Sequence, residues 1–210
     1  KAGKIKKVTT NQILGTTEWT LSNGVRVVIK PTDFKQDEIL FSAFSKGGQS
    51  LVATEDLVSA ALATDVISVS GIADMTMTDL QKALTGKNIS LSPSINANTE
   101  SIEGGTTVKD LETLLQLNYL YFTAPRRDEN AYAMLMSVLE SQLANRDKNP
   151  KVAFSDSVSM MANNYSPRTV IFNQEALTHA DLDKSLEIYK ARFANPADFI
   201  FTFVGNVNPD

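Results

Sequence analysis

TEDLVSAALATDVISVSG, residues 54–71, has the pattern of an α-helix around which the other elements of the chain are arranged. Thr54 is placed to cap the start of this helix, because it precedes two acidic residues, which are favourable near a helix N-terminus. Gly71 can end the helix in the left-handed conformation that glycine adopts readily. We therefore predict a helix over residues 54–71.

Leu62, Asp65 and Val66 share one face of this predicted helix, because residues spaced i, i+3 and i+4 lie above one another. Two of these side chains are aliphatic and the third is a short acid, a set that cannot hold a metal ion. The chain as a whole contains one His and no Cys. A hydrolytic zinc site, which needs three protein ligands and an open position for water, is therefore excluded for this chain.

The composition excludes several classes of function. At 210 residues and 42% hydrophobic, the chain fits one ordinary domain with a sizeable core. The net charge is −4 and the basic residues are dispersed, so we expect no nucleic-acid partner. No apolar run approaches the roughly 20 residues of a membrane span, so we expect no such span. The lack of cysteine rules out disulfides and leaves the compartment open.

The predicted strands come in pairs and the predicted helices in runs, which is typical of the α+β class. Asn23-Gly24 between two β-rich runs is a strong hairpin signal. The nearly unbroken apolarity from Phe199 to Val204 favours a final strand that is buried on both sides in the middle of the sheet. We predict a mostly antiparallel sheet of about five or six strands with helices packed on one face. The expected strands cover residues 18–21, 25–30, 37–45, 88–94, 98–104 and 198–204, and the expected helices cover 54–71, 78–86, 109–122, 128–146, 150–163 and 177–194, with Thr78 and Thr178 as N-caps.

The first residues differ in character from the rest of the chain. Residues 1–16 are basic and polar with little periodicity, so we interpret them as a linker from an upstream domain. Residues 17–210 are expected to form a single domain.

Two sets of residues offer a catalytic alternative. His179 directly follows the predicted cap Thr178 at a helix N-terminus, where the dipole disfavours its protonated form. The sequence has no G-x-S-x-G motif, and a local or surface role for His179 is favoured. Asp65 and Glu140 could form a paired-carboxylate site for acid/base work or for a hard cation. The favoured interpretation is that Asp65 faces a polar edge and that Glu140 is solvated.

Two glycine pairs, Gly47-Gly48 and Gly104-Gly105, lack the spacing of phosphate-binding loops. Both pairs are predicted to lie at strand ends and to form turns.

Tyr119, Tyr121 and Phe122 could form an aromatic contact surface, although their helical spacing favours a place in the core. Arg126-Arg127 could meet an acidic partner or a peptide carboxylate, and a solvated pair is the favoured interpretation.

Three separated segments together resemble the insulinase/pitrilysin family of zinc metallopeptidases. They are LSNGVRVVIKP at residues 21–31, DEILFSAFSKGGQS at 37–50, and YKARFANPADFIFTFVGNVNPD at 189–210. The order and spacing of these segments are those of the family across nearly the whole chain. The resemblance implies a metallopeptidase-like α+β domain.

The same resemblance locates the family's metal-binding positions. In active members, an inverted His-x-x-Glu-His motif on the first helix and a glutamate on a later helix bind zinc. Counting back from Gly71, the two histidine positions fall on Leu62 and Val66, and the motif's glutamate falls on Asp65. The later ligand position falls on Glu140. The resemblance therefore implies degenerate motif positions and no catalytic or metal-binding residue here.

The start of the chain looks most like the third domain of the long bacterial members, which opens their C-terminal half. The resemblance implies a non-catalytic domain of a zinc peptidase, with peptide substrates, a catalytic half on the same polypeptide, and zinc in that half. It favours a periplasmic or cell-envelope location. It also implies a domain cut short before its C-terminal helices. Two alternatives remain: an inactive binding or assembly subunit, and a free-standing hydrolase that uses His179 or Asp65 with Glu140.

Overall fold

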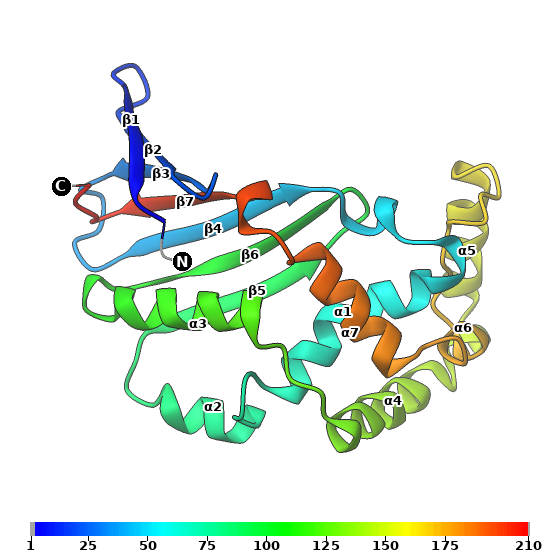
Figure 1. Ribbon diagram of the computed structural model, residues 1–210. Helices are drawn as coiled ribbons and strands as arrows, with labels where there is room; N and C mark the ends of the chain where they lie inside the picture. Colours follow the sequence, from blue (N-terminus) through cyan, green and yellow to red (C-terminus); the bar gives the residue numbers. More distant parts are fainter. Residues whose placement is uncertain (1–2, 210) are drawn as a thin grey trace.

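The computed structural model describes residues 3–209, except for the side chain of Asp147, and contains one seven-stranded sheet (Figure 1). The strand order is β1-β2-β3-β7-β4-β6-β5. From β1 to β7 the strands are Ile5–Asn11, Thr16–Leu21, Arg26–Pro31, Ile39–Lys46, Ile89–Ile95, Thr99–Thr106 and Ile200–Gly205. Strands β3 and β7 are parallel, and the other neighbouring pairs are antiparallel. The predicted α+β class with a mostly antiparallel sheet is confirmed.

The last strand, β7, lies between β3 and β4 in the middle of the sheet, as its apolarity predicts. Phe201 and Phe203 on one face of β7 are buried. Thr202 and Val204 on the other face are only half-buried. The prediction of burial on both sides is therefore wrong, because no helix layer is needed on the second face of an antiparallel sheet.

Strand β1 lies within the region predicted to be a linker. Ile5–Asn11 pairs antiparallel with β2, and every residue of β1 is exposed. An edge strand of this kind contributes backbone hydrogen bonds rather than core packing, so it leaves no clear apolar pattern in the sequence. It accounts for a sheet larger than the one predicted. A connection from this segment to an upstream domain stays a prediction.

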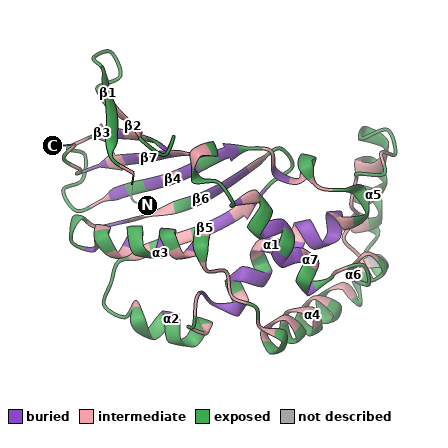
Figure 2. Cartoon of the chain, viewed as in Figure 1, coloured by how far each residue is buried: buried purple, intermediate pink, exposed green. Residues whose placement is uncertain are grey.

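The helices are α1 Leu57–Ser70, α2 Met77–Ala83, α3 Leu111–Thr123, α4 Glu129–Leu143, α5 Pro150–Ala162, α6 Gln174–Leu177 and α7 Leu182–Arg192. Helices α1 and α3 contact the sheet, and α7 packs along α1. Burial is concentrated in α1 and the central strands, whereas α4 and α5 show exposed and half-exposed residues (Figure 2). Among the helices that the structure describes, none combines the length and apolarity that a bilayer crossing requires.

Helix α1 begins later than the sequence predicts. Thr54 opens a short 3₁₀ turn, Thr54–Asp56, and the α-helix follows from Leu57. The Thr54 hydroxyl does not cap the helix; its Oγ1 accepts a hydrogen bond from Arg168 Nη1 at 3.2 Å. A distant arginine therefore uses the side chain that the local sequence assigned to capping.

The caps of two other helices are also corrected. Thr76, rather than Thr78, caps α2 and forms a reciprocal capping box with Asp79. Asp181, rather than Thr178, caps α7, because its Oδ1 accepts from the backbone N–H of Lys184 at 2.7 Å. The residues around Thr178 instead end the separate helix α6.

An aromatic cluster joins α7 to the sheet. The rings of Tyr189 and Phe193 stack with centroids 4.5 Å apart, and Phe193 stacks on Phe199 at 5.5 Å. The Tyr189 hydroxyl donates to the Tyr121 carbonyl oxygen at 3.1 Å, which joins α7 to α3. Burial raises the pKa of Tyr189 far above its usual range, so the phenol stays neutral and keeps its donor.

Candidate functional site

The two positions that the resemblance assigns to histidine ligands belong to the hydrophobic core. Leu62 is 2% exposed and Val66 is fully buried. Both lie on α1, which packs against α4 and α7. These aliphatic side chains therefore stabilise the domain by excluding water, at about 25 cal/mol for each Å² of apolar surface buried.

Asp65 and Glu140 are both exposed and come from adjacent helices. Partial desolvation by the surrounding protein raises the pKa of Asp65, even though its surface area remains accessible. Glu140 lines a pocket of about 480 Å³ between α4 and α6, together with Met136, Leu177 and other residues. Asp65 is not among the described residues that line this pocket. The structure therefore does not bring the two carboxylates into one cavity.

The residues at the motif positions do not fit a zinc ion. Within residues 3–209, no group of three or more His, Cys, Asp or Glu side chains is placed to hold a metal. Leu62 and Val66 have no donor atoms, and Asp65 and Glu140 alone would leave a zinc ion with too few protein ligands. No catalytic step can therefore be assigned to a metal at this position of the chain.

His179 lies on the surface between α6 and α7. Its backbone oxygen accepts from Ser59 Oγ at 3.5 Å, and the same Oγ accepts from the Asp181 N–H at 3.0 Å. Ser185 Oγ donates to the Ser59 carbonyl at 3.0 Å. These contacts attach the turn around His179 to α1, so the backbone of this segment has a structural role while its imidazole faces solvent.

Arg126 is not simply solvated, which corrects the prediction for the arginine pair. Its Nη1 donates to the Ser70 carbonyl in the last turn of α1 at 2.7 Å, and it pairs with Asp128, the N-cap of α4. The hydrogen bond from the Ala131 N–H, together with the Arg126 guanidinium, holds the pKa of Asp128 below its usual value. Arg127 is more exposed and pairs with Glu129 and Asp183. Arg126 therefore fixes α4 against α1.

The glycine pairs have different roles. Gly47 and Gly48 have positive φ values of 140° and 56°, as a turn requires. Gly104 and Gly105 lie inside β6, so the turn prediction is wrong for them. A Cβ on Gly104 would lie 1.9 Å from the Ser90 carbonyl oxygen, so this position needs glycine for close strand approach.

The three aromatic residues of α3 differ in burial. Tyr121 is buried, and Phe122 packs edge-on against Phe193 and Phe199. Tyr119 is 65% exposed, so the prediction of a core position is wrong for this residue.

The face of the sheet turned away from α1, α3 and α7, which we call the open face, consists mostly of exposed and half-buried residues, with Ser101 buried among them. It is built from cross-strand rows, because directly paired residues point to the same side. The rows combine Ser94, Ser101, Phe44 and Ile200; Ser92, Glu103, Ser42 and Thr202; and Ser90, Gly105, Leu40 and Val204. Hydroxyl side chains dominate this face, and Ser94 Oγ and Ser101 Oγ lie 2.9 Å apart.

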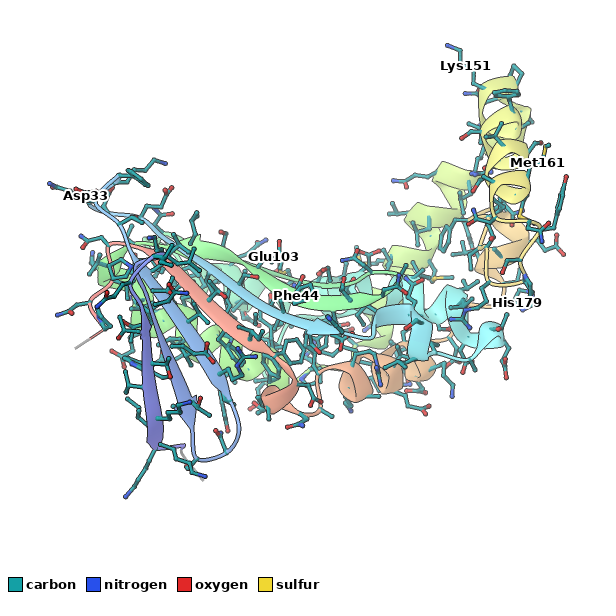
Figure 3. The ribbon with its side chains drawn as sticks, turned by 90° about the horizontal axis from the view of Figure 1, so that it is seen from above. Asp33, Phe44, Glu103, Lys151, Met161 and His179 are labelled. Atoms are coloured by element: carbon teal, nitrogen blue, oxygen red, sulfur yellow. The ribbon has the colours of Figure 1, made fainter. Side chains whose placement is uncertain are left out.

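Phe44 and Glu103 mark the middle of the open face (Figure 3). Phe44 is 40% exposed, and Glu103 is also exposed. Helix α5 rises at one end of the face, with Lys151 near its far end, and the loop bearing Asp33 rises at the other. The open face is therefore the floor of a concave surface with raised ends.

Sequence reasoning missed the open face, although a signal for it was present. Residues 89–95, ISLSPSI, alternate strictly between serine and apolar or proline residues. Such alternation indicates a strand with one face in the core and one face exposed. Extending this pattern across the paired strands would have predicted a serine-rich surface.

No family model matches the chain. Two curated proteins are similar to it in sequence. It is 29% identical over 201 residues to "Zinc protease PQQL-like" of Arabidopsis thaliana, a match that covers 93% of this chain and 18% of that protein. It is 23% identical over 195 residues to the probable zinc protease PqqL of Escherichia coli K12, which covers 92% of this chain and 21% of that protein. The chain thus spans about a fifth of the length of these relatives.

Solved structures share the fold. The periplasmic protease PqqL from Escherichia coli aligns with a TM-score of 0.81 at 23% identity, over 98% of this chain and 22% of that one. The ferredoxin protease FusC, solved in complex with Arabidopsis ferredoxin, aligns with a TM-score of 0.81 at 20% identity, over 99% of this chain and 23% of that one. A peptidase M16 inactive domain from Pseudomonas fluorescens aligns with a TM-score of 0.70 at 12% identity, over 93% of this chain and 47% of that one.

The sequence relatives and the shared fold agree with the three segments that carry the resemblance. Both curated relatives are zinc proteases by name, and one structural neighbour is an M16 domain described as inactive. In sequence and in fold, this chain is therefore similar to a peptidase-like domain of the insulinase/pitrilysin, or M16, type.

Proposed function

We propose that this domain is a non-catalytic wall of a zinc peptidase, which encloses peptide substrates while another domain of the same polypeptide carries the zinc. The observation that supports this most directly is the burial of Leu62 and Val66 at the two histidine positions. A catalytic zinc site needs three protein ligands and a bound water. Aliphatic side chains at these positions leave the domain a structural and binding role.

The open face is the surface that we assign to peptide contact. Its serine hydroxyls can both donate and accept hydrogen bonds, so they suit an extended backbone whatever its side chains. Phe44 and Leu40 add exposed apolar area for substrate side chains. A surface with these properties favours unfolded peptides of varied sequence over one specific ligand. FusC, which shares the fold, was solved with a protein partner, ferredoxin.

The proposal also covers the cellular location and a catalytic half on the same polypeptide. We expect a catalytic half on the same polypeptide, because the relatives are about five times longer than this chain. PqqL of Escherichia coli is a periplasmic protease by description, and a periplasmic or envelope location for this domain stays a prediction.

The first test measures zinc and proteolysis on the isolated 210-residue chain. Zinc is quantified by mass spectrometry after dialysis, and cleavage is followed with a quenched fluorescent peptide. We expect no stoichiometric zinc and no cleavage. Tight zinc binding with cleavage would make this a catalytic domain and would contradict the proposal. If cleavage without zinc were found, His179→Ala and Glu140→Gln would test the free-standing hydrolase.

The second test measures peptide turnover in the parent polypeptide. Phe44→Glu places a charge in the middle of the open face and should lower kcat/KM for long unfolded peptides by more than for short ones. Ile13→Glu is the matched control, because Ile13 is 96% exposed in the β1–β2 turn. Equal effects of the two variants would remove the open face from substrate contact. A parent without a His-x-x-Glu-His motif would favour the inactive assembly subunit instead.

A further inference from the structure

The open face carries two acidic side chains on one cross-strand row, and their surroundings differ. The row runs through Thr9, Glu18, Val28, Thr202, Ser42, Glu103 and Ser92. Glu18 accepts a hydrogen bond from Arg26 Nε at 2.9 Å, and this contact lowers the pKa of the Glu18 carboxyl. The exposed side chain of Glu103 makes no hydrogen bond or ion pair with the side chains and backbone that the structure describes. One carboxylate of the row is therefore neutralised within the domain, and the other is not.

The residues around Glu103 leave its charge uncompensated. Ser42 and Ser92 lie directly opposite Glu103 on the neighbouring strands. The next positions of the face are also uncharged, namely Leu40, Phe44, Ser90, Ser94, Ser101 and Gly105. The basic residue on β4, Lys46, is four residues from Ser42, which is about 13 Å along the strand. Charges separated by more than the Debye length of about 8 Å are largely screened at physiological ionic strength. Glu103 therefore presents a free negative charge.

The side chains beside Glu103 suit a long cationic side chain. Phe44 is 40% exposed and lies diagonally across from Glu103, at a spacing of about 7–8 Å (Figure 3). A cation close to an aromatic ring is attracted by the negative face of the ring. The hydroxyls of Ser42 and Ser92 make no hydrogen bond within the described part of the chain, so their oxygens can accept from an ammonium or guanidinium group. Serine side chains are short, which leaves room for the methylene stem of lysine or arginine.

The end of the open face beyond Leu40 is also acidic. Lys35, Asp37 and Glu38 line a hollow of about 330 Å³ there, together with Leu40 and other residues. Lys35 pairs with Glu38 at 2.8 Å, which leaves the charge of the exposed Asp37 in excess. The surface between Glu103 and this hollow therefore attracts cations and repels anions.

We propose that Glu103, with Phe44 and the hydroxyls of Ser42 and Ser92, forms a subsite for a lysine or arginine side chain of a bound peptide. This inference rests on the proposed function, because it requires that the open face holds the substrate. The serine-rich surface contacts the peptide backbone whatever its sequence, and the Glu103 subsite selects one cationic residue along it. Unfolded peptides that carry lysine or arginine are therefore the preferred substrates.

The test uses the parent polypeptide and pairs of quenched fluorescent peptides. Each peptide has about 20 uncharged, mostly polar residues, which span about 66 Å when extended. The two peptides of a pair differ at one position, which is lysine in one and norleucine in the other, and successive pairs move this position along the peptide. Norleucine keeps the four-carbon stem of lysine and lacks its ammonium group. Where the varied position reaches Glu103, we expect lysine to raise kcat/KM about 3–10-fold over norleucine, as an exposed ion pair with a cation–π contact would.

Three variants assign the preference to the subsite. Glu103→Gln keeps the size of the side chain and removes its charge, so it should abolish the preference for lysine over norleucine. Glu103→Lys should reverse the sign, so that a peptide with glutamate at the same position is cleaved faster than the lysine peptide. Phe44→Leu should reduce the preference about 2–5-fold through loss of the cation–π contact. Glu112→Gln is the matched control and should keep the preference, because Glu112 is exposed on α3 at the other side of the sheet and the variant loses the same charge.

The subsite is overturned if no position shows a lysine preference, if the preference survives in Glu103→Gln, or if Glu112→Gln removes it equally. Phe44→Glu separates this failure from a failure of the proposed function. If Phe44→Glu lowers kcat/KM for the norleucine peptides while Glu103→Gln changes no preference, the open face binds peptides without the subsite. If Phe44→Glu leaves the norleucine peptides unaffected, the open face is not the peptide surface, and the subsite fails with it.

A binding measurement covers the case in which the parent binds peptides without cleaving them. Fluorescence anisotropy gives the Kd of labelled lysine and norleucine peptides for the zinc-free parent, in which the peptides are not consumed. The lysine peptide should bind about 3–10-fold more tightly at low salt. This difference should shrink in 1 M salt, where the Debye length is about 3 Å. A difference that is insensitive to salt, or that remains in Glu103→Gln, would contradict a subsite that acts through the Glu103 charge.

Discussion

Helices α1 and α5 have similar lengths, 14 and 13 residues, but they are stabilised in opposite ways. Asp56 at the start of α1 makes no side-chain capping bond, yet more than half of the residues of α1 are buried. Helix α5 has Asn149 as an N-cap that accepts from the Lys151 N–H, and Pro150 in its first turn. None of the described residues of α5 is buried.

The difference teaches that caps place a helix along the sequence, whereas burial fixes it in the fold. Isolated helices of this length are marginal in water, so α1 depends on its tertiary contacts. Helix α5 is held by the bidentate pair of Arg146 with Asp156, with N–O distances of 2.6 and 2.7 Å. Changes in α1 should therefore affect the whole domain, and changes in α5 should remain local.

The largest expected effect comes from rebuilding the metal motif with Leu62→His, Asp65→Glu and Val66→His together. Two imidazoles would enter the core without hydrogen-bond partners, at a cost of about 1–3 kcal/mol each in addition to the lost apolar burial. Since small domains are stable by only about 5–15 kcal/mol, we expect most of the cooperative unfolding transition to be lost in urea.

The control for this variant is Val158→His on α5, where the side chain is 47% exposed and the stability should change by no more than about 0.5 kcal/mol. Thermal melts with and without zinc complete the comparison. If zinc restored the rebuilt variant to the stability of the original chain, the face of α1 would be a preserved metal-site geometry rather than core.

A smaller effect is expected from Arg126→Ala, which removes the contact between the end of α1 and the start of α4. The lost hydrogen bond from a charged donor to the Ser70 carbonyl corresponds to about 1.5–3 kcal/mol of unfolding free energy. Urea denaturation measures this loss of unfolding free energy. Arg127→Ala removes a more exposed pair and should lower the unfolding free energy by less. A larger loss for Arg127→Ala than for Arg126→Ala would show that the surface pair determines the position of α4.

Much of the fold was predictable from local patterns. The central place of β7 followed from its apolar run, and Gly71 does end α1 with φ of 83°. Strand β1 and the caps at Thr76 and Asp181 were missed. Several residues near these helix starts can cap, and tertiary contacts choose among them, as Arg168 does by binding Thr54.

The site was harder to predict than the fold. The sequence located Leu62 and Val66 by counting from Gly71, but their burial depends on α4 and α7, which are distant in sequence. The open face depends on strand register, because Glu103 faces Ser42 and Ser92 only through pairings that no single segment specifies. Local alternation indicates that a strand has an exposed face, whereas predicting which residues make up the whole face requires the strand order.

A local effect of pH is expected at α5. Its partner Arg146 holds the pKa of Asp156 below the usual value of 3.8. Because the pKa is lowered in the folded state, the pair stabilises the attached helix above that usual value and is lost as the pH falls through the lowered pKa. The protection of the α5 amides against hydrogen exchange, relative to the intrinsic exchange rate at each pH, should therefore fall below about pH 4, before the protection of α1 does. Asp156→Asn should show low protection of the α5 amides at every pH. Loss of protection in α1 at the same pH as in α5 would contradict the expectation that α5 opens locally.

The smallest effect is expected from Phe154→Ser on α5. Phe154 is 72% exposed, so its removal loses little burial, and the free energy of unfolding should change by no more than about 0.5 kcal/mol. Phe193→Ser is the contrast in the core, because Phe193 is 1% exposed and truncation of a buried phenylalanine costs about 3–5 kcal/mol. Urea midpoints compare the two variants at several protein concentrations. A loss above 1 kcal/mol for Phe154→Ser that grows with concentration would mean that α5 is buried against a second copy, and α5 would then depend on burial as α1 does.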